Sequence, residues 1–295
     1  MKVTRFGITC IVLLLTLGLW SCGSKKEKDD SSDEFKQAEE SLNDEIKDVV
    51  YNIPSPSEIP YMLQATGAEF NQGLLSDRKK ADSYLTKNDK AALNLGVYAA
   101  DIGYLVSYDK TQDAINYVNA AKKLADNLGV LGSFDADLMK RFEANISVKD
   151  SLARMVNGAI KETEKYLKND NRSKPAALML TGSFIEGLYI STGLIKSYPK
   201  NILKDDDRSL ILTPLINVVI NQRKSVDELI KMLNTVEQSE PITSLLTDLN
   251  SLQSSYGAMN IEEHLKNNRP DLVLNDKNLV DLTNTIEKIR KSVTE

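Results

Sequence analysis

The chain has 295 residues, a formal net charge of −5, two cysteines and one histidine. An acidic chain without a basic stripe argues against nucleic-acid binding, which requires neutralisation of phosphates. The single histidine, His264, excludes a zinc site built on two histidines, and any histidine-based nucleophile would depend on it alone. Its polar surroundings favour a surface position. No GxSxG, P-loop or GxGxxG motif occurs, so the usual signs of acyl-transfer or nucleotide chemistry are missing.

The N-terminal residues have the pattern of a secretory signal. Lys2 and Arg5 precede an apolar run that is too short for a membrane span of about 20 residues. The run ends in LWSC, which resembles the bacterial lipobox, in which signal peptidase II cuts before a cysteine that carries diacylglycerol. This resemblance implies removal of residues 1–21 and a lipid anchor on Cys22, which holds the chain to a membrane without crossing it. An ordinary cleaved signal with a chance cysteine is the alternative.

Cleavage before Cys22 would limit the chemistry of the mature chain. Cys10 leaves with the signal and lipid occupies Cys22, which excludes disulfides, thiolate catalysis and cysteine-bound metals. Loss of two positive charges changes the net charge from −5 to −7. Residues 22–40 are polar and low in apolar content, which predicts a solvated tether. We expect a protein anchored by lipid to the outer membrane, on its periplasmic or its surface face.

Residues 41–295 have helical periodicity almost throughout, with few strand signals, which predicts a single all-α domain. Proline favours the first turn of a helix, where its missing N–H costs nothing, and Pro175, Pro214 and Pro241 are expected there. The acidic run DDDRS at 205–209 lacks the glycine and glutamate of a calcium loop and favours a helix N-terminus. Helices are expected near 41–51, 57–72, 77–86, 90–108, 110–128, 135–145, 148–168, 174–197, 206–236, 240–256, 260–267 and 276–293.

An internal repeat is the most informative feature of the chain. The segment AALNLGVYAADIGYL at 91–105 aligns without gaps to AALMLTGSFIEGLYI at 176–190, with five identities in fifteen positions. Downstream, residues 115–128 align to 216–229 with six identities in fourteen. The matches keep the same order, which predicts a tandem duplication.

The duplication predicts the architecture of the domain. We expect two helical bundles of about four helices each, over about 57–147 and 148–256, followed by a closing C-terminal helix.

Four segments of the chain carry a family resemblance. They are SPSEIPYMLQATGAEFNQGLL at 55–75, KAALNLGVYAADIGYL at 90–105, KKLADNLG at 122–129 and GSFIEGLYI at 182–190. These segments resemble an uncharacterised family of all-helical lipoproteins from Bacteroidota. The resemblance covers about residues 50–200 and implies a source and an envelope address, with no assigned activity. Imelysin-like proteins offer a further fold analogy, but their GxHxxE metal motif is missing here, and no cofactor or metal is expected.

The repeat aligns two acids, Asp101 and Glu186, that lie in otherwise apolar, small-residue helices. If equivalent helices face each other, mutual repulsion and burial would raise at least one carboxyl pKa, as catalysis or cation binding would use. The alternative is that each acid accepts local hydrogen bonds, because duplication copies a structural acid as readily as a functional one. The candidate binding residues are Asp101, Glu186, Tyr98, Tyr104, Asn94 and Tyr189.

Three functions remain open from the sequence. A non-enzymatic envelope lipoprotein that binds or scaffolds a protein or glycan fits the anchor, the tether and the missing catalytic motifs. A carboxylate-dependent enzyme on envelope glycans would use Asp101 and Glu186 as acid and base. A small-molecule or cation receptor would use the same acids.

Overall fold

The computed structural model describes residues 53–129, 173–197, 205–259 and 277–295, with isolated helical positions between 140 and 158. These residues form helices and no strands, which confirms the all-α class. The signal, the tether and the helices expected at 41–51 and 260–267 lie outside the described residues, as do most of those expected at 135–145 and 148–168.

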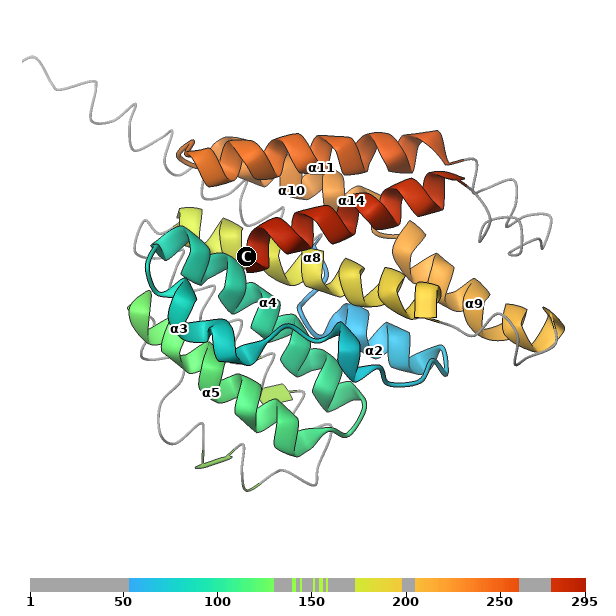
Figure 1. Cartoon of the computed structure of the whole chain (residues 1–295), viewed down its shortest axis with the longest axis horizontal. Helices are drawn as coiled ribbons and strands as arrows, with labels where there is room; N and C mark the ends of the chain where they lie inside the picture. Colours follow the sequence, from blue (N-terminus) through green and yellow to red (C-terminus); the bar gives the residue numbers. More distant parts are fainter. Residues whose placement is uncertain are drawn as a thin grey trace, which may run out of the picture. The chain divides into compact units, whose positions relative to one another are not determined.

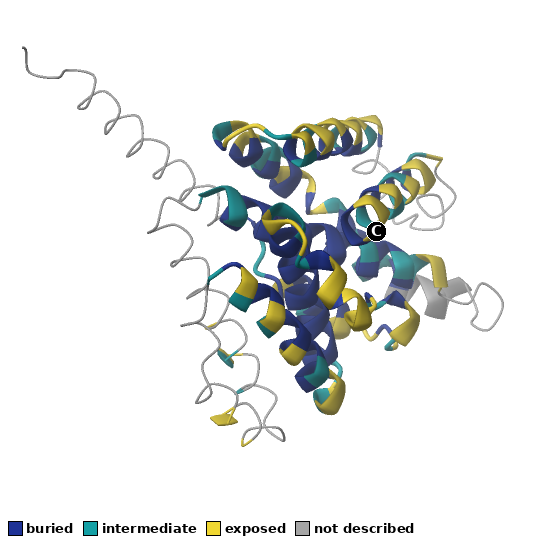
Figure 2. Ribbon diagram, turned by 60° about the vertical axis from the view of Figure 1, so that its left-hand side comes forward, coloured by how far each residue is buried: buried dark blue, intermediate teal, exposed yellow. Residues whose placement is uncertain are grey.

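Two long helices, α4 (Asn88–Ser107) and α8 (Ser173–Ser197), form the centre of the domain and contain the two aligned segments. They contact each other more extensively than any other pair of elements (Figure 1). Both helices are buried over most of their length, whereas the surrounding helices turn exposed faces outward (Figure 2). Their apolar and small side chains are therefore core residues, which is the main source of stability in a helical domain.

Glycine allows α4 and α8 to approach closely. A Cβ on Gly96 would lie 1.9 Å from the carbonyl oxygen of Met179, and one on Gly182 would lie 2.0 Å from that of Leu93. Such distances are far inside van der Waals contact, so any larger residue would push the two backbones apart.

The described elements between residues 53 and 129 pack around α4. Helix α2 (Glu58–Ala65) contacts both α4 and α8, and α5 (Thr111–Asn127) packs along α4. Between α2 and α4 the chain forms two 3₁₀ turns and a short helix. These are η1 (Gln72–Leu74), η2 (Arg78–Lys80) and α3 (Ala81–Tyr84).

The described elements from residue 205 onward pack on α8 and on one another. Helix α9 (Asp205–Ile220) contacts α8, and α10 (Arg223–Thr235) pairs with α11 (Glu240–Ala258). The last helix, α14 (Lys277–Thr294), contacts α8, α11 and α4. Its apolar stripe recurs every three or four residues, as expected for a helix with one buried face. The buried apolar residues are Leu279, Leu282, Ile286, Ile289 and Val293.

Several expected boundaries are wrong. The helix expected at 57–72 ends at Ala65, where Thr66 bonds back to the Leu63 carbonyl and Gly67 takes a φ of 81°. The helix expected at 206–236 is interrupted after Ile220, so it forms α9 and α10. Pro214 lies inside α9 and not in a first turn. The acidic run at 205 does begin a helix, as expected.

The duplication remains a prediction. Residues 115–128 belong to α5 and its C-cap, whereas the aligned residues 216–229 cross the break between α9 and α10. The other match, 91–105 with 176–190, does fall on two helices that pack directly together.

Candidate functional site

The two aligned acids meet at the α4–α8 interface. Asp101 lies on α4 and Glu186 on α8, and both are 0% exposed. Their side chains act on each other directly. Burial raises the pKa of both groups, the charge of Glu186 raises that of Asp101 further, and Asp101 partly opposes the rise at Glu186. The two carboxyl groups therefore lie close together in the core, between α4 and α8.

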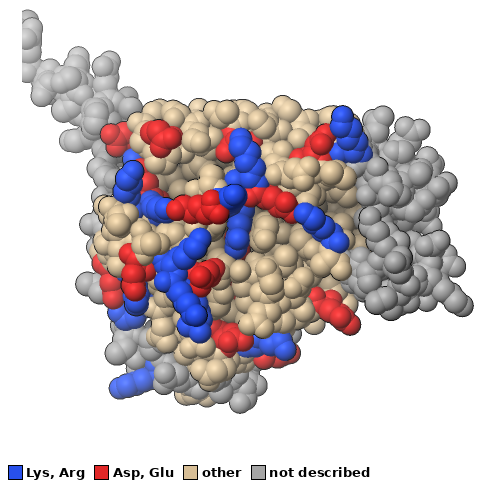
Figure 3. All heavy atoms as spheres, in the orientation of Figure 1, with Lys and Arg blue, Asp and Glu red and all other residues tan. Residues whose placement is uncertain are grey.

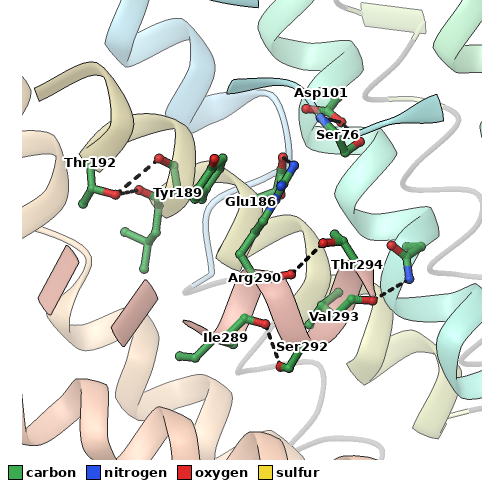
Figure 4. A network of polar contacts seen from close by, with 12 residues as sticks. Ser76, Asp101, Glu186, Tyr189, Thr192, Ile289, Arg290, Ser292, Val293 and Thr294 are labelled. Atoms are coloured by element: carbon green, nitrogen blue, oxygen red, sulfur yellow. Dashed lines mark hydrogen bonds and ion pairs between the residues drawn. The ribbon is translucent and has the colours of Figure 1, made fainter. Parts of the chain in front are cut away.

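Arg290 of α14 neutralises Glu186. Its Nε donates to Oε2 at 3.0 Å and its Nη2 donates to Oε1 at 3.1 Å, which is a two-pronged contact across helices far apart in the sequence (Figure 4). The guanidinium also lies 4.4 Å from the ring centroid of Tyr189, close enough for a cation–π contact. Arg290 is 17% exposed on its side chain, so the pair is largely desolvated. Paired donors in a fixed plane make this a strong type of ion pair.

Among the described residues, Ser76 supplies the hydrogen-bond donors to Asp101. The backbone N–H of Ser76 donates to its Oδ2 at 3.3 Å, and the Ser76 hydroxyl donates to the same oxygen. Ser76 lies between η1 and η2, in the segment next to α4 (Figure 4). No donor among the described residues reaches Oδ1 of Asp101. Ionised Asp101 would therefore place an uncompensated negative charge in the core.

The environment decides which acid carries a proton. Burial raises the pKa of Asp101 well above its ordinary value, and the charge of Glu186 raises it further, against the lowering effects of Ser76 and Arg290. Burial also raises the pKa of Glu186, but Arg290 opposes this through its charge and its hydrogen bonds. One guanidinium balances one carboxylate, which favours the ionised form of Glu186 and the protonated form of Asp101. When protonated, Asp101 can donate a hydrogen bond to Glu186 through Oδ1, the oxygen that no described donor reaches.

The other candidate residues hold neighbouring segments in place. The Asn94 amide donates to the Val293 carbonyl at 2.9 Å, which fixes the end of α14. The Tyr98 hydroxyl donates to the Asp77 carbonyl at 3.2 Å. The Tyr104 hydroxyl accepts from the Asn71 backbone N–H at 2.9 Å, and burial raises the pKa of Tyr104 to about 12. These tyrosines and Asn94 bind the protein's own backbone.

Further donors fix the last turn of α14. The Tyr84 hydroxyl donates to the Thr294 carbonyl at 2.9 Å, and Lys80 donates to the same oxygen at 3.3 Å. Lys90 donates to the Glu295 carbonyl at 2.6 Å. Cations at the C-terminal end of a helix complement its dipole. This docking positions Arg290, which lies one turn earlier, against Glu186.

The arrangement suits internal charge compensation better than substrate chemistry. Glycoside hydrolysis needs two carboxyl groups that flank an accessible sugar bond, but Asp101 and Glu186 are both fully buried. In the part of the chain that the structure describes, no three His, Cys, Asp or Glu side chains gather as metal ligands would. Cys22 lies outside the described residues.

Helix α8 is long and apolar enough to span a membrane by length and composition. Its most apolar window is 83% buried within the protein, and it carries Glu186 paired to Arg290. The described structure therefore uses α8 as a core helix.

Two residues of the network were missed in the sequence. Ser76 lies in an irregular segment and gives no signal. Arg290 gives a weak sequence signal. It follows Ile289 at the edge of the apolar stripe of α14, and a buried acid in an apolar helix requires a cation nearby. With 37 lysines and arginines in the chain, that requirement does not select the partner.

None of the protein-family models matches the chain, and searches of curated proteins and of solved structures likewise find no match.

Proposed function

We propose that this protein is a lipid-anchored lipoprotein of the cell envelope that acts as a non-enzymatic binding or scaffolding module. One observation carries the non-enzymatic part. The acids best suited to catalysis are 0% exposed and are engaged by Ser76 and Arg290 inside the core. Groups held in this way stabilise an arrangement of helices and do not reach a polymeric substrate.

The lipid anchor on Cys22 is testable directly. Growth with a labelled fatty acid should label the protein, and Cys22→Ala should abolish the label and release the protein from membranes. Cys10→Ala is the matched control, since Cys10 lies in the signal and should not affect labelling. Labelling that persists in Cys22→Ala would contradict the anchor.

The exposed surface indicates what kind of partner fits. Among the described residues, the one exposed large apolar side chain is that of Val280, which is 49% exposed. On the face shown in Figure 3, positive and negative side chains are interspersed rather than segregated. A partner that contacts this part of the chain would meet polar groups, which suits a glycan or a polar protein surface.

Crosslinking in intact cells tests the scaffolding role. A polar crosslinker should recover a reproducible protein or glycan attached to the wild-type chain, and Cys22→Ala should lose it if the anchor places the protein beside its partner. Recovery of no attached species across growth conditions would contradict the proposal.

Two other functions use the acids themselves. A carboxylate-dependent enzyme on envelope glycans is favoured by the meeting of one protonated and one ionised carboxyl, and opposed by their burial. A small-molecule or cation receptor would show ligand-dependent thermal stabilisation. The Asp101→Asn variant distinguishes these two functions from the scaffolding role. Loss of glycan turnover or of ligand stabilisation in a folded variant would support them, whereas an unchanged result would support the scaffold.

A further inference from the structure

The α4–α8 interface contains an imbalance of charged groups. Two carboxyl groups, on Asp101 and Glu186, face one guanidinium, on Arg290. All three groups lie at the centre of the domain, where glycine brings the helix backbones into direct contact. Water cannot compensate a second negative charge there, because both carboxyl groups are 0% exposed.

Other titratable groups near Asp101 do not supply the missing positive charge. The segment at η2 contributes Asp77 and Arg78, whose charges act on the surrounding tyrosines. Helix α2 places apolar Ile59 against α8, and its Glu58 is exposed. Neutral phenols surround the pair from three elements, namely Tyr84 of α3, Tyr98 and Tyr104 of α4, and Tyr117 of α5.

We propose that the Asp101–Glu186 pair is a proton-dependent lock: one proton shared by the two carboxyl groups holds α4 against α8, and its loss loosens the interface. The fold is then tighter in acidic surroundings than in alkaline ones. This inference rests on the buried geometry and does not depend on the lipid anchor or on a partner.

The direction of the pH dependence follows from linkage. In the unfolded chain Asp101 titrates near an ordinary aspartate pKa of about 3.9, whereas in the folded chain its pKa is raised well above that value. Between these two pKa values the folded chain holds one more proton than the unfolded chain, so stability falls as the pH rises. The contribution is complete below the unfolded pKa and is lost as the pH passes through the folded pKa.

Chemical unfolding of the purified full chain at a series of pH values tests the lock. Above about pH 4, the unfolding equilibrium constant of the wild type should rise about tenfold per pH unit relative to Asp101→Asn. Asparagine can still donate to Glu186 but cannot lose a proton, so this variant should lack that part of the slope. An identical slope in wild type and Asp101→Asn would overturn the proposal.

Asp248→Asn is the matched control. Asp248 is also nearly buried, at 8% side-chain exposure, and is paired with a cation of α14, Lys288, at 2.7 Å. Its partner is a cation rather than a second acid, so its replacement should leave the wild-type slope in place. Loss of the slope in Asp248→Asn as well would overturn the assignment to Asp101.

Infrared spectroscopy of the wild type provides a second readout if Asp101→Asn does not fold. The folded chain should retain the carbonyl absorption of a protonated carboxylic acid at neutral pH, and this band should disappear as stability falls on alkalinisation. Absence of the band in folded protein at pH 6 would overturn the lock.

Discussion

Helices α8 and α14 are joined by two ion pairs in very different surroundings. Glu186 and Arg290 form a two-pronged pair in the interior, with side-chain exposures of 0% and 17%. Lys196 and Glu287 form a contact of 2.7 Å at the surface, with exposures of 64% and 38%. The formal charges of the two pairs are the same. Only the inner pair is largely removed from water, so breaking it leaves a buried charge without a counter-ion. Burial, more than charge, should therefore decide which residues matter.

The largest effect is expected when Arg290 is removed. Arg290→Ala leaves ionised Glu186 buried without a counter-ion, and we expect a loss of about 3–5 kcal/mol in the free energy of unfolding. Lys196→Ala breaks the outer pair between the same helices and should change it by about 0–1 kcal/mol. Urea unfolding measures both values. Equal losses in the two variants would remove the distinction between the inner and outer pairs.

A second comparison concerns glycine. Gly96→Ala would place a Cβ 1.9 Å from the Met179 carbonyl, and since backbone cannot move aside easily we expect a loss of about 3 kcal/mol. Gly257 of α11 has nothing within 4 Å of its Cβ position, so Gly257→Ala should be neutral or stabilise by up to about 1 kcal/mol. Thermal unfolding distinguishes the two, and a Gly96→Ala variant as stable as the wild type would mean that α4 and α8 are not in direct contact.

The smallest effects are expected for the aligned tyrosines. Tyr104→Phe leaves the Asn71 backbone N–H without its acceptor and should cost about 1–2 kcal/mol. Tyr189→Phe keeps the aromatic face beneath Arg290 and should remain within about 0.5 kcal/mol of the wild type. The midpoints of urea unfolding compare the two variants. A larger loss of stability for Tyr189→Phe than for Tyr104→Phe would show that the Tyr189 hydroxyl has a structural role of its own.

The sequence predicted the parts of the fold that depend on local patterns. The limits of α4, α5, α8, α11 and α14 agree with helical periodicity to within about two residues, because apolar residues recur at helical spacing along each of them. The break after Ile220 was missed, since the polar residues 221–225 that follow it, NQRKS, contain no glycine or proline to signal a helix end. The extension to residue 72 was wrong because a backbone turn at Thr66 and Gly67 ends α2.

The site was predicted only in part. The alignment of residues 91–105 with 176–190 places Asp101 at the position of Glu186, so the two acids could be selected together without knowledge of the tertiary structure. Their partners come from a turn between short helices and from the last helix, and contacts at such sequence separations are set by packing. Asn94, Tyr98 and Tyr104 were chosen as binding residues because they flank Asp101, but their polar atoms bond to the chain's own backbone.

A double-mutant cycle between Glu186 and Arg290 tests the account most directly. Glu186→Met, Arg290→Met and the double variant replace charge with apolar volume at one or both positions. We predict that the double variant is more stable than Arg290→Met, with a coupling free energy of about 2 kcal/mol or more, because no buried charge is left unpaired. Stability losses that add to within about 0.5 kcal/mol would contradict a structural ion pair at the centre of this fold.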